Sequence, residues 1–315
     1  MVACSVIVPL YNKAPYIVRA LDSIVAQTFQ DYEVIVVDDG SSDGGGALAA
    51  AYPDPRVRVV TQANSGPGAA RNRGIAEAQG DLIAFLDSDD EWLPEHLTDG
   101  VAGLQRQYPR AASFTAGYIV YPTRISTEPM WRERGVTDGV HRVSPETSPY
   151  LLSQMLAFMC PWTTVTYREV LRKWGGFYAK NRCVYGEDSF LWLKVLLNEQ
   201  VAFQLSPRVI QHREASSLSY NLRGPRPLEP MLDDMAEIEA VCPPELRELL
   251  KRCCTFRAFK TACVWGYWGN WRQARDLRNR FRTPQDYRIP YYATSLVCST
   301  PVISVLGRFW RAVSQ

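Results

Sequence analysis

Short apolar runs and longer amphipathic stretches alternate along the first hundred residues. The apolar runs are rich in Val, Ile and Leu and lie at 5–8, 33–37, 57–61 and 82–86. Each is followed by a stretch with helical spacing, at 14–26, 45–51, 68–78 and 94–107. Continuous apolar runs are typical of strands that are covered on both faces. The alternation therefore predicts an α/β fold with a mostly parallel sheet and flanking helices.

The pattern is less regular after residue 111. A strand is expected at 112–121, and the segment 122–149 has weak periodicity, which fits either an inserted lid or a surface excursion. Later expected elements are strands at 163–166, 201–205 and 209–212 and helices at 168–174 and 189–197. From residue 228 the pattern is helical, with a break at Cys242-Pro243-Pro244.

These elements predict an α/β domain over residues 1–222, with halves at about 1–110 and 111–222. Residues 223–315 are expected to form a helical appendage. The chain is 46% hydrophobic and 22% charged, which suits a globular protein with a sizeable core.

The eight cysteines form no CxxC pair and have no zinc-site spacing. Several lie in apolar segments, which favours buried free thiols in a reducing compartment. The chain enters its first predicted strand without a basic leader, so we expect no export and a cytoplasmic location.

Charge is distributed unevenly along the chain. Residues 247–315 contain thirteen Lys/Arg and three acids, a local net charge of +10, which leaves −8 for residues 1–246. A basic, Trp-rich region beside an acidic body suits an anionic surface, so peripheral contact with the inner membrane face is a hypothesis. The uncharged run 291–307 is 17 residues long and contains Pro301, whereas a spanning helix needs about 20 apolar residues. We expect it to be a core or interfacial segment.

Three tryptophans in the basic region, Trp265, Trp268 and Trp271, lie three residues apart. This spacing predicts one helix with an aromatic stripe. The stripe would either pack into a core or lie at a membrane interface.

Polar residues follow each of the four predicted parallel strands. They occupy 9–13, 38–43, 66–74 and 87–90. The carboxyl ends of parallel strands meet at one edge of an open sheet, where ligands bind. Taken singly, each group could be a turn or a helix cap. Their convergence on one edge predicts a binding site.

The residue types at this edge suit a nucleotide. Tyr11 could stack on a base, Asp39 could accept a hydrogen bond from a base N–H, and Arg71 could meet a carbonyl or a phosphate. Asp87, Asp89 and Asp90 lie within four positions and would repel one another unless a cation or several donors face them.

Four segments carry a family resemblance, namely 6–12, 37–41, 66–74 and 85–90. In this order and spacing they resemble the nucleotide-sugar domain of family 2 glycosyltransferases, which are inverting enzymes of the GT-A type with a Rossmann-like sheet. The resemblance covers roughly residues 3–220. The QxxRW motif of the processive members is absent from the sequence, which favours transfer of a single sugar.

The resemblance implies roles for individual residues. Asp87-Ser88-Asp89 matches the DxD motif, in which the first acid binds the donor ribose and the last holds a divalent metal. Pro9, Tyr11, Asp39 and Arg71 match residues that bind the nucleotide base. Mg²⁺ or Mn²⁺ suits oxygen ligands and would neutralise charge on a departing diphosphate.

A second motif region lies about a hundred residues later. Gly175-Gly176-Phe177 and the segment 185–192 resemble the family's GGF and ED-x-x-x-W region, which implies that Asp188 is the catalytic base. From the residues alone, Asp188 could equally cap a helix. Asp90, Glu187 and Trp192 are expected to contact the sugar or the acceptor. His212 could reach the metal or the diphosphate, or lie in a surface loop.

The resulting prediction is a metal-dependent inverting glycosyltransferase. It would move one hexose or N-acetylhexosamine, from a UDP-sugar for instance, to a saccharide or lipid-linked acceptor in surface polysaccharide or glycolipid biosynthesis. No nucleic-acid partner is expected. One alternative is an inactive nucleotide-sugar-binding or scaffolding protein. Another is a nucleotidyltransferase, which would need a Gly-rich loop after the first strand that residues 9–13 lack.

Overall fold

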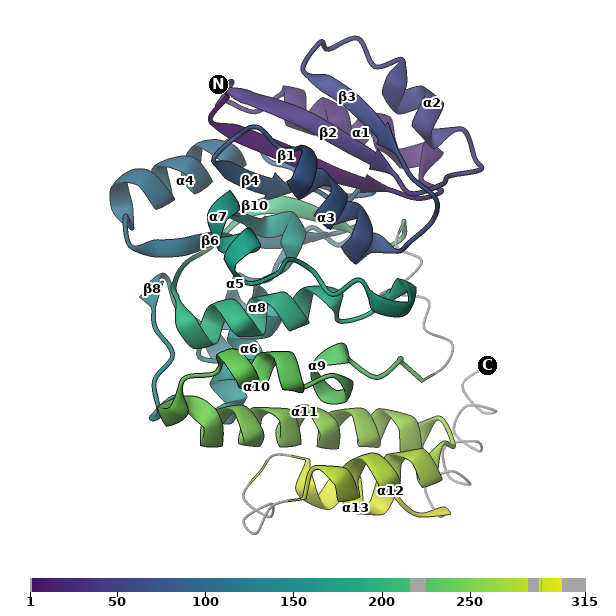
Figure 1. Cartoon of the computed structure of the whole chain (residues 1–315), viewed down its shortest axis with the longest axis vertical. Coiled ribbons are helices and arrows are strands. Elements are labelled where there is room, and N and C mark those ends of the chain that lie inside the picture. The colour runs from purple at the N-terminus through teal and green to yellow at the C-terminus, as the bar shows by residue number, and fades with distance from the viewer. Residues whose placement is uncertain (1, 216–224, 283–288, 290, 302–315) are drawn as a thin grey trace. The chain divides into compact units, whose positions relative to one another are not determined.

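The computed structural model describes residues 2–215, 225–282, 289 and 291–301, which form two compact units (Figure 1). The first unit consists of Met1–Val143 and Gln154–Tyr220. The second consists of Ser144–Ser153 and Asn221–Gln315. The first contains a ten-stranded sheet, and the second is helical.

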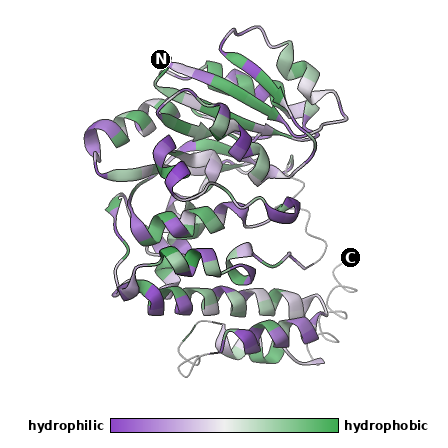
Figure 2. Ribbon diagram, viewed as in Figure 1, coloured by the Kyte–Doolittle hydropathy of each residue, from purple (hydrophilic) through white to green (hydrophobic). Residues whose placement is uncertain are grey.

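The N-terminal part of the sheet is parallel. Its strands pair in the order β3-β2-β1-β4, with bounds β1 Cys4–Leu10, β2 Tyr32–Asp38, β3 Val57–Thr61 and β4 Leu82–Phe85. The connecting helices are α1 Ala14–Val25, α2 Gly45–Ala50 and α3 Pro67–Glu77. Figure 1 shows α3 in front of these strands, and Figure 2 shows that the strands are mainly hydrophobic. The predicted α/β fold class is confirmed.

The remaining strands make the sheet mixed, where a mostly parallel sheet was expected. Strand β9 (Thr164–Tyr167) lies between β4 and β6 (Ala111–Tyr121) and runs antiparallel to both. Strand β6 pairs in parallel with β10 (Gln200–His212). Three short strands pair antiparallel with these two: β5 Glu91–Trp92 and β8 Gly139–His141 with β10, and β7 Ile125–Ser126 with β6.

Strand β10 corrects a prediction. The two expected strands at 201–205 and 209–212 are one strand with register shifts around Pro207. Proline cannot donate a hydrogen bond to the ladder, so the polar break at Ser206-Pro207-Arg208 is a bulge within continuous pairing to β6.

The helices of the first unit follow the predicted order. The expected helix at 94–107 is α4 (His96–Ala102) continued by a π-helical turn, Gly103–Gln107. The weakly periodic segment after β6 contains β7, α5 (Glu128–Glu133) and β8. Helix α6 (Pro149–Phe158) has residues 149–153 in the second unit and residues 154–158 in the first. The other helices of the first unit are α7 Arg168–Lys173 and α8 Glu187–Asn198, with 3₁₀ turns at Pro161–Thr163 and Lys180–Arg182.

The second unit corrects the tryptophan prediction. Its elements are α9 Pro230–Asp233, α10 Ala236–Val241, a 3₁₀ turn Pro244–Leu246, α11 Arg247–Tyr267, α12 Trp271–Arg280 and α13 Tyr292–Cys298. Trp265 lies in α11 and Trp271 begins α12, so one helix does not carry the stripe. Gly269, with φ of +94°, turns the chain between them. The predicted break at residues 242–244 is confirmed.

Two other expectations concern the cysteines and the membrane. All eight cysteines are free, as expected, and most are buried. The uncharged run 291–307 is described only as far as residue 301, and this part contains helix α13. Residues 302–307 lie outside the described part of the chain. Among the described residues, no helix has the length and apolar character needed to cross a bilayer.

His96 is a buried titratable group in the first unit. Its side chain is fully buried at the start of α4 and stacks on Trp92, with ring centroids 4.5 Å apart. Neither ring nitrogen has a hydrogen-bond partner. Burial lowers the pKa of His96 from 6.5 to about 3, so the folded protein holds this ring neutral.

We expect His96 to make the folded state less stable in acid. The unfolded imidazole takes up a proton below its pKa of 6.5, whereas the buried ring resists protonation until about pH 3. The free energy of unfolding should therefore decrease as the pH falls from 6.5 towards 3, by about 2 kcal/mol at pH 5 from this group. His96→Phe should lose this part of the pH dependence, as measured by urea unfolding at neutral and acidic pH. Identical pH profiles for the two proteins would contradict this expectation.

Candidate active site

Arg71 joins the two acidic motif regions of the sequence. Its guanidinium donates from Nη1 to Glu187 Oε1 at 2.9 Å and from Nη2 to Asp87 Oδ1 at 2.7 Å. Asp87 follows β4, Arg71 lies on α3 and Glu187 begins α8. The structure thus brings together side chains that are more than a hundred positions apart in the chain.

Two further contacts fix α3 against the segment that leads into α8. Asn72 donates from Nδ2 to the Phe177 carbonyl oxygen and accepts from the Phe177 N–H, both at 2.8 Å. Gly68 allows a close approach, because a Cβ there would lie 2.3 Å from the Tyr178 carbonyl oxygen. The Gly-rich segment 66–74 therefore serves to dock α3 on the GGF region.

Burial and neighbouring charges set the electrostatics around Arg71. Burial lowers the pKa of Arg71, but the charges of Asp87 and Glu187 raise it by more. The pKa of Glu187 is raised to about 7, first by burial and then by the Asp188 charge, against the opposing effect of Arg71. Glu187 therefore holds a proton for part of the time near neutral pH.

Asp188 lies in the first turn of α8, and its Oδ1 accepts the N–H of Ser189 at 2.7 Å. Its charge contributes to raising the pKa of Arg71 and, after burial, that of Cys160. The charges of Asp87 and Asp90 also raise the pKa of Cys160. Carboxylates of both acidic motif regions therefore act electrostatically on the Cys160 thiol. Cys160 was not predicted, and no sequence motif marks it.

Asp89 pairs with a cation supplied by the chain itself. Lys13 Nζ lies 2.6 Å from Asp89 Oδ2 and also donates to the Ala215 carbonyl oxygen at 2.5 Å. Burial and the Asp87 charge raise the pKa of Asp89, while Lys13 lowers it. Lys13 was not predicted as a site residue, although it directly follows Tyr11 and Asn12 in the first motif.

Asp90 is the most buried of the three aspartates, with 5% of the residue exposed. Its Oδ1 accepts the backbone N–H of His212 at 2.7 Å. Burial raises the pKa of Asp90 well above its usual value, and the charges of Asp89 and Asp87 add to this effect. The hydrogen bond connects the DxD segment to the end of β10.

These carboxylates fit a divalent cation that takes its other ligands from a substrate. In the described part of the chain, no group of three or more His, Cys, Asp or Glu side chains could hold a metal ion. Mg²⁺ in enzymes is usually bound by one or two carboxylates together with substrate phosphates and water. Asp87 and Asp89 offer such oxygens, and the Lys13 ammonium already occupies a cation position beside Asp89. A metal ion at Asp89 would replace this ammonium.

His212 is engaged on both sides of its ring. Nε2 lies 2.5 Å from Glu91 Oε1, and Nδ1 lies 2.8 Å from Glu214 Oε1. The side chain is buried, so the expectation of a surface-loop histidine is wrong. Both ring nitrogens face carboxylates, so a metal bond from His212 would require one of these contacts to open.

The residues predicted to bind the nucleotide differ in accessibility. Tyr11 is 49% exposed at the end of β1, so its ring is open to stacking, whereas Pro9 is half-buried within the strand. Asp39 is only 3% exposed. Its carboxylate accepts from Gln62 Nε2 at 2.7 Å and from the N–H groups of Ser65 and Gly66 at 2.8 Å. Asp39 thus holds the loop that enters α3 and has room for about one more hydrogen bond.

Trp192 is not placed as predicted. Its side chain is 0% exposed and packs edge-on against Phe177, with ring centroids 5.8 Å apart. The indole is therefore part of the core and is not accessible to a sugar or an acceptor.

Comparison with known proteins gives matches over the same motifs. A family model described as "Glycosyl transferase family 2" matches residues 5–175. The succinoglycan biosynthesis protein ExoO of Rhizobium meliloti is 53% identical over 92 residues, which are 29% of this chain and 26% of that protein. The matched segment therefore spans about a quarter of the length of this relative.

Solved structures match this chain over most of its length. Residues 1–349 of S. aureus TarS match with a TM-score of 0.69 and 19% identity, covering 98% of this chain and 91% of that one. The same TarS segment was solved in complex with UDP-GlcNAc. The mannosyltransferase PcManGT from Pyrobaculum calidifontis, in complex with GDP-Man and Mn²⁺, matches with a TM-score of 0.53 and 18% identity, covering 98% and 88%. At these identities the likeness concerns the fold.

Proposed function

The chain belongs to glycosyl transferase family 2, and we propose that it transfers a single sugar from a nucleoside diphosphate sugar to an acceptor hydroxyl with inversion. One observation carries this proposal: Arg71 joins Asp87, at the predicted donor edge, to Glu187 at the start of α8. Asp188 lies next to Glu187. An inverting displacement needs a base on the face of the sugar opposite the leaving group, and a second acidic cluster can supply it.

In the proposed reaction, Asp188 takes the proton of the acceptor hydroxyl as its oxygen attacks the anomeric carbon. The new bond forms while the bond between the anomeric carbon and the diphosphate oxygen breaks, and the nucleoside diphosphate leaves with the electron pair. Tyr11 and Asp87 would hold the base and the ribose. Asp90 and Glu187 would hold hydroxyl groups of the sugar or the acceptor, Glu187 as a donor when it is protonated.

We propose that Asp89 holds Mg²⁺ or Mn²⁺ together with the donor diphosphate. When bound, such an ion neutralises the charge of the leaving diphosphate. The proposal is supported by the Asp89 carboxylate, which already binds the Lys13 ammonium. It is also supported by the Mn²⁺ in the P. calidifontis mannosyltransferase structure.

Removing the internal cation should strengthen metal binding. Lys13→Met is expected to bind Mn²⁺ roughly tenfold more tightly, because the ion no longer competes with a charge 2.6 Å from Asp89. Asp89→Asn should lose this binding. Mn²⁺ titration followed by EPR, without nucleotide, measures both effects. Lys173→Met is the control, because Lys173 pairs with Glu199. Unchanged affinity in Lys13→Met would show that the lysine and the metal do not share Asp89.

We further propose a UDP-hexose or UDP-N-acetylhexosamine donor and an acceptor in surface polysaccharide or glycolipid synthesis. The TarS complex with UDP-GlcNAc supports the donor class, and the succinoglycan biosynthesis protein supports the acceptor class. The excess of Lys and Arg in residues 247–315 supports peripheral contact of the second unit with an anionic membrane surface at the cytoplasmic face.

A panel of nucleoside diphosphate sugars tests the proposed activity. With Mn²⁺ present, the protein should release nucleoside diphosphate from one class of donor, and EDTA should stop the release. Donor binding without any release, with or without candidate acceptors, would instead support the alternative of an inactive nucleotide-sugar-binding protein.

A further inference from the structure

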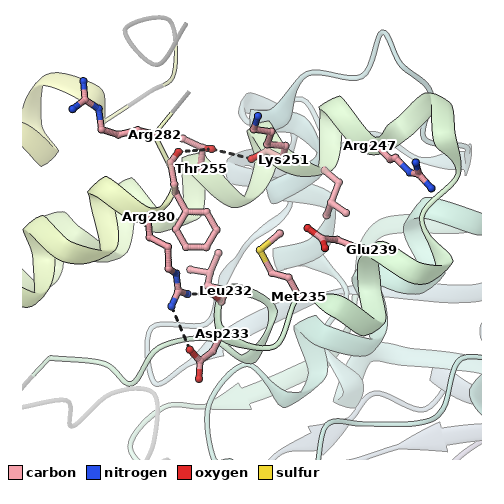
Figure 3. A pocket seen from close by; sticks show the side chains of 11 residues that line it. Leu232, Asp233, Met235, Glu239, Arg247, Lys251, Thr255, Arg280 and Arg282 are labelled. Atoms are coloured by element: carbon pink, nitrogen blue, oxygen red, sulfur yellow. Dashed lines mark hydrogen bonds and ion pairs between the residues drawn. The ribbon is translucent and has the colours of Figure 1, made fainter. Parts of the chain in front are cut away.

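A pocket of 710 Å³ lies within the helical second unit (Figure 3). Helices α9, α10 and α11 and the end of α12 contribute its walls. Its apolar lining residues are Leu232, Met235, Leu250 and Phe281. Its charged lining residues are Asp233, Glu239, Arg247, Lys251, Arg280 and Arg282. The volume falls within the range of about 300 to 1,000 Å³ that is usual for small-molecule sites.

Helical spacing on α11 places apolar and cationic groups side by side. Arg247, Leu250 and Lys251 are three and four positions apart, so they share one face of the helix. Leu250 is buried, and Arg247 and Lys251 are exposed. This face of α11 therefore combines a buried apolar side chain with two exposed cationic side chains.

The charges of the pocket are only partly balanced. Arg280 pairs with Asp233 and donates to the Leu232 carbonyl oxygen. Within the described part of the chain, Arg247, Lys251 and Arg282 make no side-chain hydrogen bond or ion pair. Figure 3 shows their charged ends at the margin of the pocket, while Leu232 and Met235 lie at its centre and the Glu239 carboxylate lies between Met235 and Arg247. Cations thus outnumber the two acids, Asp233 and Glu239, around an apolar centre.

We propose that this pocket binds an amphiphile that carries a phosphate group on a hydrocarbon chain. The chain would pack on Leu232, Met235 and Phe281, and the phosphate would pair with Arg247 and Lys251. A free phosphate would fit less well, because the cations surround the apolar centre and do not point into it. The inference rests on the proposed membrane contact and assigns that contact to a defined pocket.

Short-chain phosphatidic acid, used below its micelle concentration, tests the pocket apart from any membrane. Isothermal titration of the full chain should give at least tenfold tighter binding for this lipid than for inorganic phosphate. Arg247→Gln/Lys251→Gln should weaken lipid binding at least tenfold. Met235→Trp, which fills the centre, should also weaken it. Circular dichroism and thermal unfolding verify that the variants fold.

Arg272→Gln/Arg275→Gln is the matched control. It removes the same charge from α12, where both guanidinium groups lie over the Trp271 ring and do not line the pocket. This control should retain lipid binding. Equal losses in the two double variants, equal affinity for inorganic phosphate, or no binding would each overturn the pocket assignment. Flotation with anionic vesicles tests membrane contact separately. If the Arg247→Gln/Lys251→Gln and Met235→Trp variants both still bind the vesicles, the proposed membrane contact stands and only its assignment to the pocket is rejected.

Discussion

Asp188→Asn is expected to reduce the turnover number for sugar transfer about a thousandfold and to change donor affinity little. General base catalysis contributes roughly 10² to 10⁴ in rate, and asparagine cannot accept the proton. Donor affinity should persist because the groups proposed to bind the nucleotide, Tyr11 and Asp87, follow strands β1 and β4, whereas Asp188 lies on α8. Steady-state rates at saturating donor and a donor titration measure the two quantities separately.

Glu187→Gln distinguishes the two neighbouring acids. Burial and the Asp188 charge raise the pKa of Glu187 to about 7, so glutamine resembles the protonated form that is present for part of the time near neutral pH. The variant should keep much more activity than Asp188→Asn. Near-normal turnover in Asp188→Asn together with an inactive Glu187→Gln would move the base to Glu187.

Arg71→Met is expected to lower the free energy of unfolding by about 3 to 5 kcal/mol, because it removes the partner of the buried Glu187 carboxylate and of the partly exposed Asp87 carboxylate. The guanidinium is nearly inaccessible, with 6% of the side chain exposed, and holds Asp87 and Glu187 at 2.7 and 2.9 Å. Urea unfolding measures the change. Donor binding should also fall, because Asp87 loses its orientation.

The pH dependence of this variant follows from Glu187. Its pKa in the folded protein, about 7, lies above the ordinary value of 4.5. The contribution of Glu187 to the free energy of unfolding is therefore most favourable in acid and decreases as the pH rises from 4.5 through 7. Without Arg71, the pKa of Glu187 should rise further, and the loss of stability should be larger in alkali than in mild acid. Glu187→Gln in the Arg71→Met background should recover part of the loss.

Arg73→Met is the control for Arg71→Met. Arg73 lies on the same helix, but it is half exposed and pairs with Glu77 one turn away. Its loss should cost no more than about 0.5 kcal/mol. Similar losses for the two variants would contradict the account of Arg71 as the link between the acidic clusters.

The sequence pattern predicted the N-terminal strands well because β1, β2 and β4 are buried almost throughout and each contains a run of apolar residues. It failed where pairing overrides local signals. Pro207 looks like the end of a strand, yet β10 continues past it because β6 supplies a partner on both sides of the bulge. The tryptophan spacing concealed a turn that depends on the positive φ of Gly269.

The sequence identified the acidic residues of the candidate site but not the side chains that pair with them. Motif order identified Asp87, Asp89 and Asp188 as candidates, whereas the contacts of Lys13 with Asp89 and of His212 with Glu91 join positions 76 and 121 residues apart. Arg71 was expected at the nucleotide base, and its pairing with Asp87 and Glu187 was not predicted. Such long-range pairs depend on how the strands close together, which local periodicity does not encode.

The configuration of the product formed from UDP-GlcNAc tests the central claim most directly. Methanol can serve as a small acceptor, because a methyl glycoside does not mutarotate after release. Since the sugar is α-linked in UDP-GlcNAc, inverting transfer should give methyl β-N-acetylglucosaminide, identified by its anomeric proton coupling in NMR. The product should be absent with EDTA and with Asp188→Asn. The α-glycoside, or the β-glycoside formed equally by Asp188→Asn, would contradict inverting transfer with Asp188 as the base.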